Sequence, residues 1–426
     1  MNNRRRRPLP RSRRARATLA GVIVLLIAGT ALGGYLYERH RTGSIYHPHA
    51  RFIPQPSPTL PKAGPDRFSW PLYGYSKDHT RFFPAPASVR PPFRHLWVHN
   101  RHALLEFPPV IYGNHIFQLA DNGVLAALDK ANGRTFWSRQ LGQLSASTPA
   151  VSSSTVYATV LSGSGGGQGR VWALNYRDGK TRWYRDLPSP SESSPLLDGN
   201  RLFFGSQSGR VYALDARNGD VLWTYQAHGA VKASPTLSNG TLYFGDYSGH
   251  VQAISEQTGK ALWVSGSEGT LLGSGTFYST AAVVYGRVFL GNTDGRVYAY
   301  DAFTGKLDWA VQTGDYVYSS PAATNAPELG PTIYIGSYSG TFYAFNARTG
   351  QIDWSFNAHG RISGSPTIIG RIVYFAVLGG HQTYGLGIST GRVFFHADTG
   401  SFDPVISDSK DIYLTGYTAL YGLEPR

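Results

Sequence analysis

Residues 209–223 read Gly209-Arg210-Val211-Tyr212-Ala213-Leu214-Asp215-Ala216-Arg217-Asn218-Gly219-Asp220-Val221-Leu222-Trp223, and the rest of the chain is organised around copies of this stretch. Its first glycine and its tryptophan are 14 positions apart, and the same spacing joins Gly123 to Trp137, Gly169 to Trp183, Gly249 to Trp263, Gly295 to Trp309 and Gly340 to Trp354. A less regular seventh copy ends at Phe395. A period of about 40–50 residues predicts a repeat architecture.

Each copy has the pattern of a β-hairpin. Val211 and Ala213 lie in an alternating run that is typical of a half-buried strand. Asp215 and Gly219 flank the reversal, where an Asp side chain can accept hydrogen bonds from the turn backbone and Gly adopts positive φ at low cost. The strand after the turn carries the tryptophan.

Two further strands precede each hairpin. They begin at a Ser-Pro or Thr-Pro pair and continue into a Phe/Tyr-rich run, as in Ser194-Pro195 followed by Leu202-Phe203-Phe204. Each unit is therefore expected to be a four-stranded antiparallel sheet. Such a sheet cannot bury both of its faces alone, and radial stacking of several sheets solves this problem. The pattern predicts an all-β fold, a β-propeller.

The two ends of the repeat region complement each other. Residues 403–424 supply three strands and lack a tryptophan strand, whereas Trp97 lies in a strand with no preceding hairpin. We expect residues 94–99 to pair antiparallel with residues 419–424. This closure gives eight blades and removes open sheet edges. The aromatic residues expected to pack between blades are Trp97, Trp137, Trp183, Trp223, Trp263, Trp309, Trp354 and Phe395.

The segments before the propeller differ in composition. Residues 1–16 contain eight Arg and no acid, and residues 17–37 contain no charge. About 20 apolar residues span a bilayer, and flanking Arg favours the cytoplasmic side. We expect a basic cytoplasmic tail at 1–16, a transmembrane anchor at 17–37, a Pro-rich linker at 38–69 and an extracytoplasmic propeller at 70–426. The alternative is a secreted protein whose signal peptide is cleaved near Ala31 or Gly33.

Charge and cysteine content exclude several classes. The formal net charge is +14, but the part after residue 69 holds 27 basic and 24 acidic residues, so it contributes only +3. A nucleic-acid partner is therefore not expected. The chain has no cysteine, which excludes a disulfide framework, c-type haem attachment and a lipidated N-terminal cysteine. P-loop, zincin and nucleophile-elbow motifs are absent, and we expect no metal site and no catalytic residue.

The repeat resembles that of the quinoprotein, or PQQ-type, β-propellers. The matching pattern is Val211-Tyr212-Ala213-Leu214-Asp215, then Gly219 and Trp223, and the opening from Trp70 to Arg81 also looks like the start of PQQ dehydrogenases. This resemblance implies eight blades and, as one possibility, a sugar or alcohol oxidoreductase that uses PQQ with calcium. Those enzymes keep a Cys-Cys pair, which is missing here. BamB-like propellers, which are non-enzymatic, resemble the chain in size and blade number, and they imply no cofactor.

The loops that lead from each tryptophan strand to the next blade are expected to enter the central channel. We expect a ligand or partner site at the channel mouth, formed by Glu106, Glu192, His228, Lys232, Tyr278, Asp315, Tyr318, His359 and Arg361. Glu192 and Lys232 come from neighbouring blades and are expected to pair. The sequence favours a non-catalytic scaffold that binds a protein or envelope component. An oxidoreductase and a ligand sensor that uses the channel mouth remain alternatives.

Overall fold

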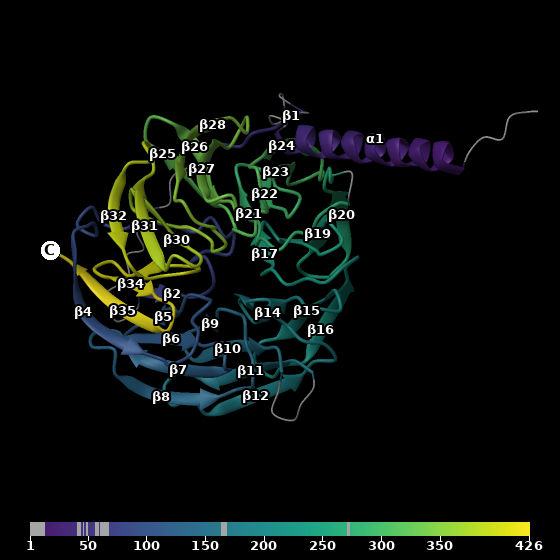
Figure 1. Ribbon diagram of the computed structural model, residues 1–426. Coiled ribbons are helices and arrows are strands. Elements are labelled where there is room, and N and C mark those ends of the chain that lie inside the picture. The colour runs from purple at the N-terminus through teal and green to yellow at the C-terminus, as the bar shows by residue number, and fades with distance from the viewer. Residues whose placement is uncertain are drawn as a thin grey trace, which may run out of the picture. The chain divides into compact units, whose positions relative to one another are not determined.

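The computed structural model describes residues 13–40, 44–45, 47, 50–55, 59, 68–162, 168–270 and 273–426 (Figure 1). The chain divides into two units, residues 1–41 and 42–426. The first unit contains one helix, α1 (Arg13–His40). Within the described residues, no helix has the length and hydrophobicity that crossing a membrane requires. Residues 1–12 of the expected basic tail and most of residues 56–67 of the expected linker lie outside the described residues.

The described strands of the second unit form eight sheets that follow one another around a ring, and all strand pairs are antiparallel except that of β3 (Phe82–Phe83) with β29 (Thr367–Ile369) (Figure 1). The predicted all-β propeller of four-stranded blades is therefore confirmed. We name the blades A to H in chain order.

The first four blades have regular strands. Blade A contains β5 (Val110–Tyr112), β6 (His115–Leu119), β7 (Val124–Asp129) and β8 (Thr135–Gln140); blade B contains β9 (Ala150–Val151), β10 (Thr155–Val160), β11 (Arg170–Asn175) and β12 (Thr181–Asp186). Blade C contains β13 (Leu196–Asp198), β14 (Arg201–Phe204), β15 (Arg210–Asp215) and β16 (Val221–Gln226); blade D contains β17 (Thr236–Ser238), β18 (Thr241–Gly245), β19 (His250–Ser255) and β20 (Ala261–Gly266).

The second half of the ring continues the pattern. Blade E contains β21 (Ala282–Val284), β22 (Arg287–Gly291), β23 (Arg296–Asp301) and β24 (Leu307–Gln312); blade F contains β25 (Ala322–Ala326), β26 (Gly330–Gly336), β27 (Thr341–Asn346) and β28 (Ile352–Asn357). Blade G contains β29 (Thr367–Ile369), β30 (Ile372–Val377), β31 (Gln382–Gly387) and β32 (Val393–Ala397); blade H contains β33 (Val405–Ser407), β34 (Ile412–Thr415), β35 (Ala419–Pro425) and β4 (Phe93–Asn100).

Blade H joins the two ends of the propeller. Strand β4 lies antiparallel to β35, with Trp97 opposite Gly422 and Asn100 opposite Ala419. The closure expected from the sequence is confirmed, since residues 94–100 supply the outer strand that the C-terminal unit lacks. The sheet edge of β35 is thereby paired rather than exposed.

Each outer-strand tryptophan contacts the turn of the following blade. The Nε1–H of Trp183 donates to the carbonyl of Ala216 at 3.0 Å, and the ring lies over Gly219. A Cβ atom on Gly219, which has φ +78°, would lie 2.6 Å from Trp183 Cε3. Trp97, Trp137, Trp223, Trp263, Trp309 and Trp354 donate to the next blade in the same way. Phe395, which has no such donor, packs against Tyr374 and Phe93.

Residues 68–83, here called the inner segment, follow the inner strands around the ring. Strand β2 (Ser69–Trp70) pairs with β5, and β3 (Phe82–Phe83) pairs in parallel with β29. Carbonyl groups between them accept backbone N–H bonds of 2.7–2.9 Å from β9, β17, β21 and β25. Lys77 pairs with Asp198 of blade C, and Arg81 pairs with Asp403 at the entry to blade H. The inner segment therefore contacts every blade.

Part of the expected linker also lies against the propeller. Strand β1 (Ser44–Ile45) adds to the outer edge of β24. Ile53 donates its N–H to Tyr285 O at 3.0 Å, and Phe52 stacks on Tyr285 with ring centroids 5.2 Å apart. Trp309 beneath β1 is fully buried, whereas most equivalent tryptophans are half-buried. The spacer role of residues 38–69 stays a prediction.

Candidate functional site: the channel cavity

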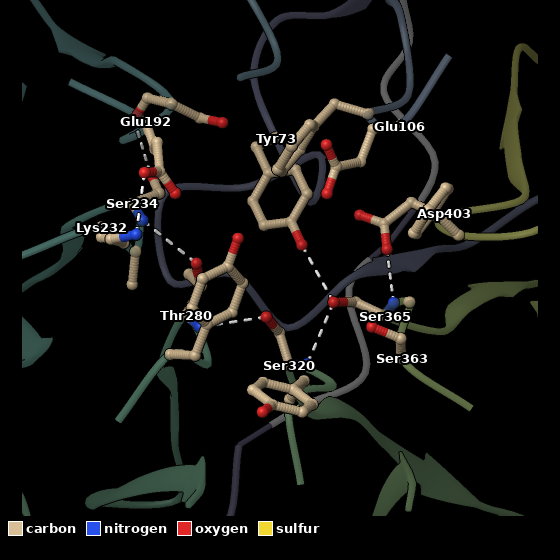
Figure 2. Close-up of a pocket in the computed structure, with 17 residues that line it drawn as sticks. Tyr73, Glu106, Glu192, Lys232, Ser234, Thr280, Ser320, Ser363, Ser365 and Asp403 are labelled. Carbon is tan, nitrogen blue, oxygen red and sulfur yellow. Dashed lines mark hydrogen bonds and ion pairs between the residues drawn. The ribbon is translucent and has the colours of Figure 1, made fainter. Parts of the chain in front are cut away.

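A cavity of about 520 Å³, open to solvent, lies where the inner strands meet, and we call it the channel cavity (Figure 2). Its lining contains Glu106, Glu192, Lys232, Tyr278 and Tyr318 from five interblade loops. These are five of the nine residues that the sequence singled out. They meet because each occupies the same position of its interblade loop, three residues before the place that Pro195 takes in blade C.

Glu192 and Lys232 form an ion pair across blades. The Nζ atom of Lys232 lies 2.8 Å from Glu192 Oε1, and both side chains are largely buried. Glu192 also accepts a hydrogen bond from Gln207 Nε2 at 2.5 Å. Lys232 lies over the ring of Tyr247, 4.9 Å from its centroid. These contacts hold both charges in place and partly neutralise them.

Glu106 is the carboxylate without a partner. Among the described residues it has no hydrogen bond and no ion pair. Burial raises the pKa of Glu106 to about 7, and the neighbouring carboxylates of Asp403, Glu192 and Asp121 add to this effect. A cation that entered the cavity would lower the pKa of Glu106 again, because it would supply an opposite charge next to the carboxylate.

Tyrosine rings continue from the cavity to its rim. Tyr278 lies 5.8 Å from Tyr318 and 6.0 Å from Tyr247, and Tyr318 lies 5.1 Å from Tyr338. Burial raises the pKa of Tyr278, helped by Glu106 and Glu192, so its hydroxyl is neutral and can donate a hydrogen bond. The electron-rich faces of such rings favour cations.

Hydrogen bonds from backbone N–H groups to hydroxyl groups form a chain along the channel wall, through the serines of three Ser-Pro pairs and through Thr280 at the same position of blade E. The backbone N–H of Ser234 donates to Thr280 Oγ1 at 3.1 Å, that of Thr280 to Ser320 Oγ at 3.0 Å, and that of Ser320 to Ser365 Oγ at 3.0 Å (Figure 2). Ser365 donates to the Asp403 carboxylate, which takes the serine's place in blade H. The residues at this repeated position thus link blades D to H in order.

Sequence reasoning missed three residues at this wall. Asp403 accepts from Arg81 Nη2 at 3.2 Å, and the Arg81 side chain stacks on Tyr73 at 4.3 Å. The hydroxyl of Tyr73 bonds to Ser365 Oγ at 2.9 Å, and burial raises the pKa of Tyr73 to about 12. The replacement of serine by Asp403 in the last Ser-Pro motif was a signal that could have revealed this group.

Four predicted residues do not line the cavity. The side chain of Asp315 accepts from the N–H of Tyr316 at 2.8 Å, and Arg361 lies over Tyr338 at 5.3 Å. His359 is exposed. His228 stacks on His250 with ring centroids 4.7 Å apart. These side chains belong to the same loops but are not among the residues that line the channel cavity.

The lining of the channel cavity does not fit PQQ by itself. PQQ is a planar tricarboxylic acid, which requires cations and donors around it. The charged lining residues are the acids Glu106, Glu192 and Asp403 and one cation, Lys232. Lys232 already pairs with Glu192, and Arg81 behind the wall pairs with Asp403, so Glu106 is the acid that keeps its charge uncompensated. Within the described residues, the acids of this cavity do not form a group of three that could hold one metal ion. The arrangement favours a cationic occupant over an anionic one.

Comparisons with known proteins agree with the fold. Solved structures that resemble the chain include BamB from Moraxella catarrhalis (18% identity, TM-score 0.64), which covers 78% of this chain and 100% of its own. The quinohemoprotein alcohol dehydrogenase from Comamonas testosteroni (14% identity, TM-score 0.68) covers 93% of this chain and 84% of its own. A europium-containing methanol dehydrogenase (14% identity, TM-score 0.68) covers 85% and 98%. At these identities the likeness shows the fold alone.

No curated protein matches the sequence significantly. A family model described as outer membrane protein assembly factor BamB matches residues 94–197, 167–321 and 320–422. These segments overlap and together cover most of the chain, including all eight blades. The chain therefore belongs to this BamB family of PQQ-type β-propellers.

Proposed function

We propose that the protein is a non-catalytic scaffold that binds a basic segment of an envelope protein at the channel cavity. The observation that carries this proposal is Glu106, a partly buried carboxylate without a partner among the described residues. The other two acids of the lining are already paired, Glu192 with Lys232 and Asp403 with Arg81. A lysine or arginine side chain of the partner would supply the missing cation, since it would pair with Glu106 and contact the faces of the tyrosine rings.

The propeller acts outside the cytoplasm in this proposal, held by residues 17–37. The support is the uncharged run at 17–37 next to eight Arg in residues 1–16. Full-length protein is expected to stay in the membrane fraction after high-salt and carbonate washes. Recovery of a soluble form that begins after Gly33 would show signal cleavage instead.

Binding of model peptides tests the basic partner. Isothermal titration of the full-length protein with a Lys/Arg-rich decapeptide and with a Glu-rich one should show binding of the basic peptide only. Glu106→Gln should weaken that binding about tenfold or more, as expected for loss of a charge-assisted hydrogen bond. Glu328→Gln changes an exposed glutamate and is the matched control. Equal affinities for all three proteins would exclude the cavity as the binding site.

An oxidoreductase is the alternative that the dehydrogenase-like structures suggest. Titration with PQQ and calcium, followed by protein fluorescence and dye-linked dehydrogenase activity, separates the two functions. We expect PQQ binding no tighter than the high-micromolar range, roughly −5.5 kcal/mol or weaker. Nanomolar PQQ binding with sugar- or alcohol-dependent dye reduction would overturn the scaffold function. Binding of a small polar ligand, with no peptide binding, would favour a sensor.

A further inference from the structure

A second group of polar residues lies on the connection between blades C and D, apart from the residues that line the channel cavity. One ligand atom each from His228, Asp246 and His250 lies within 4.8 Å of the other two. His228 is in the loop between the blades, and Asp246 and His250 flank the turn that joins β18 to β19. Two imidazoles and a carboxylate are the donors that zinc and other divalent transition metals prefer.

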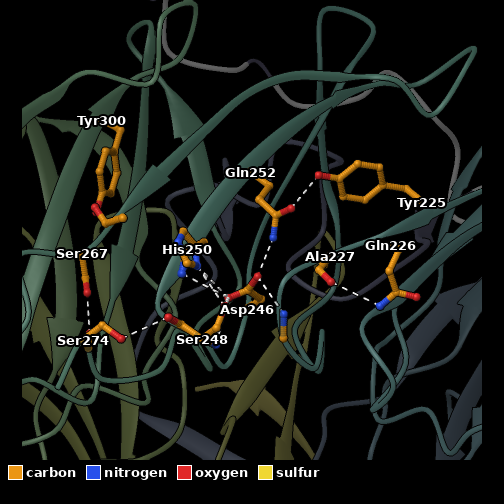
Figure 3. Close-up of polar contacts among 12 residues, drawn as sticks. Tyr225, Gln226, Ala227, Asp246, Ser248, His250, Gln252, Ser267, Ser274 and Tyr300 are labelled. Atoms are coloured by element: carbon orange, nitrogen blue, oxygen red, sulfur yellow. Dashed lines mark hydrogen bonds and ion pairs between the residues drawn. The ribbon is translucent and has the colours of Figure 1, made fainter.

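Asp246 is held rigidly (Figure 3). It is fully buried, and its Oδ1 accepts the N–H groups of Ser248 and His250 at 2.9 and 3.1 Å. Its Oδ2 accepts Gln252 Nε2 at 2.5 Å, and Gln252 is in turn fixed by the Tyr225 hydroxyl at 2.8 Å. Such outer contacts orient a carboxylate for a metal ion before the ion arrives.

The other blades show that the turn does not require this carboxylate. The place of Asp246 is taken by Ala120, Ser206, Asn292 and Ser337 in blades A, C, E and F, and the place of His250 by Val124, Arg210, Arg296 and Thr341. His228 has one counterpart, His359 of blade F, which also lies between Ala and Gly. Among these blades, only blade D with the loop that precedes it combines His228, Asp246 and His250. The other blades form the same turn without them.

The spacing of the ligand atoms suits an ion. Asp246 Oδ1 and His250 Nδ1 are 3.9 Å apart, and bonds of about 2.0–2.2 Å from each reach a common ion. The Ser248 hydroxyl now lies between them, 2.7 Å from Oδ1 and 2.9 Å from Nδ1. Rotation of this side chain frees the position. The exposed His228 ring is stacked on His250, and one of its nitrogens lies within 4.8 Å of the other two ligand atoms, where it can supply the third ligand.

We propose that His228, Asp246 and His250 form a binding site for a divalent transition-metal ion, with zinc as the expected species. The ion would tie the loop between blades C and D to the turn of blade D. The site adds to the scaffold function and does not depend on it.

Metal titration of the untagged full-length protein tests this proposal. Co²⁺ should produce visible absorption bands of a low-coordinate site at one equivalent, and Zn²⁺ should abolish them. His228→Ala and His250→Ala should each weaken Zn²⁺ binding at least tenfold, measured by competition with a chelator. His359→Ala is the matched control and should leave the affinity unchanged. Ser248→Ala should bind Zn²⁺ at least as tightly as the wild type, since it removes the competing hydroxyl.

Thermal unfolding gives a second readout. Zn²⁺ should raise the midpoint of the wild type and of His359→Ala, but not that of His228→Ala or His250→Ala, because a ligand that binds only the folded state stabilises it. If all variants have the same unfolding midpoint in the presence of a chelator, the substitutions do not disturb the fold. A missing Zn²⁺-induced rise in the midpoint then results from the loss of the metal ligand. Zn²⁺ binding that is equally strong in the double variant His228→Ala/His250→Ala, or no one-equivalent Co²⁺ spectrum in the wild type, would overturn the proposal.

Discussion

Two separate constraints require glycine in each hairpin turn: a positive φ angle and the lack of space for a side chain. Gly219 has φ +78°, and it also lies beneath the ring of Trp183 from the preceding blade. Gly199 has φ +53° with open space around its Cα. We predict that Gly199→Ala costs about 1–2 kcal/mol, the price of a left-handed alanine. Gly219→Ala should cost a further 1–3 kcal/mol because the added methyl group must displace the ring. Denaturant unfolding of both variants measures the difference, and equal losses would contradict the docking argument.

Glu106 should make stability depend on pH. Its folded-state pKa is raised to about 7, above the unfolded value of about 4.3, so the native state binds the proton more tightly between these values. Stability is therefore lost as pH rises from about 4 through 7. Glu106→Gln should stabilise the protein by about 1–3 kcal/mol at pH 8 and change little at pH 4. Glu328→Gln should show no such contrast, and an equal effect of Glu106→Gln at both pH values would argue against a raised pKa.

Residue patterns predicted part of the channel cavity and not the rest. Glu106, Glu192, Lys232, Tyr278 and Tyr318 could be found because each occupies one position of the repeat, and repeats place equivalent positions around one axis. Side-chain directions within the loops are not set by the period, and His228 and Asp315 are not among the residues that line the cavity. Tyr73 and Arg81 lie outside the repeat, so the repeat period does not predict the path of the inner segment.

The elements that close the ring are the two segments outside the regular repeat. Strand β4 could be predicted because the last unit lacked one strand and Trp97 belonged to none. The path of the inner segment depends on backbone hydrogen bonds of 2.7–2.9 Å. These bonds join it to inner strands that are far apart in the sequence. Local propensity has no information about such pairings, because strand partners are set by tertiary context.

Trp97 tests strand β4 directly. Its ring is 8% exposed, its Nε1–H donates to Lys130 O at 3.0 Å, and a Cβ on Gly133 would lie 2.6 Å from the ring. Trp97→Ala should therefore cost about 3–5 kcal/mol, like the loss of a core aromatic. Leu96→Ala on the same strand removes a more exposed side chain and is expected to cost much less. A comparable loss of stability in both variants would mean that pairing of strand β4, rather than docking of the Trp97 ring, provides the stabilisation.

Arg81 tests the inner segment in the same manner. It is 1% exposed and donates to Pro366 O at 2.6 Å, to Ser365 O at 3.3 Å and to Asp403. Removal of one partner from a buried pair leaves the other charge unpaired, so Arg81→Met should cost about 3–5 kcal/mol. The double variant Arg81→Met/Asp403→Ser restores the serine of the repeat and should recover part of this loss. Urea unfolding of the single and double variants measures the recovery, and a double variant no more stable than Arg81→Met would refute the pairing.

At the scale of the whole molecule, we expect ring closure to make the eight blades one cooperative unfolding unit. Deletion of residues 70–99 from the full-length chain removes β4 and nearly all of the inner segment, so it exposes the edge of β35 and removes contacts with every blade. In a linear array of repeats, loss of a terminal element would affect only its neighbour. In a closed ring the deletion should lower the unfolding midpoint of the entire domain and promote aggregation through the exposed edge. Thermal unfolding with light scattering, with Trp97→Ala as the milder comparison, measures both effects. A deletion variant that stays monomeric with the wild-type midpoint would show that ring closure contributes nothing to stability.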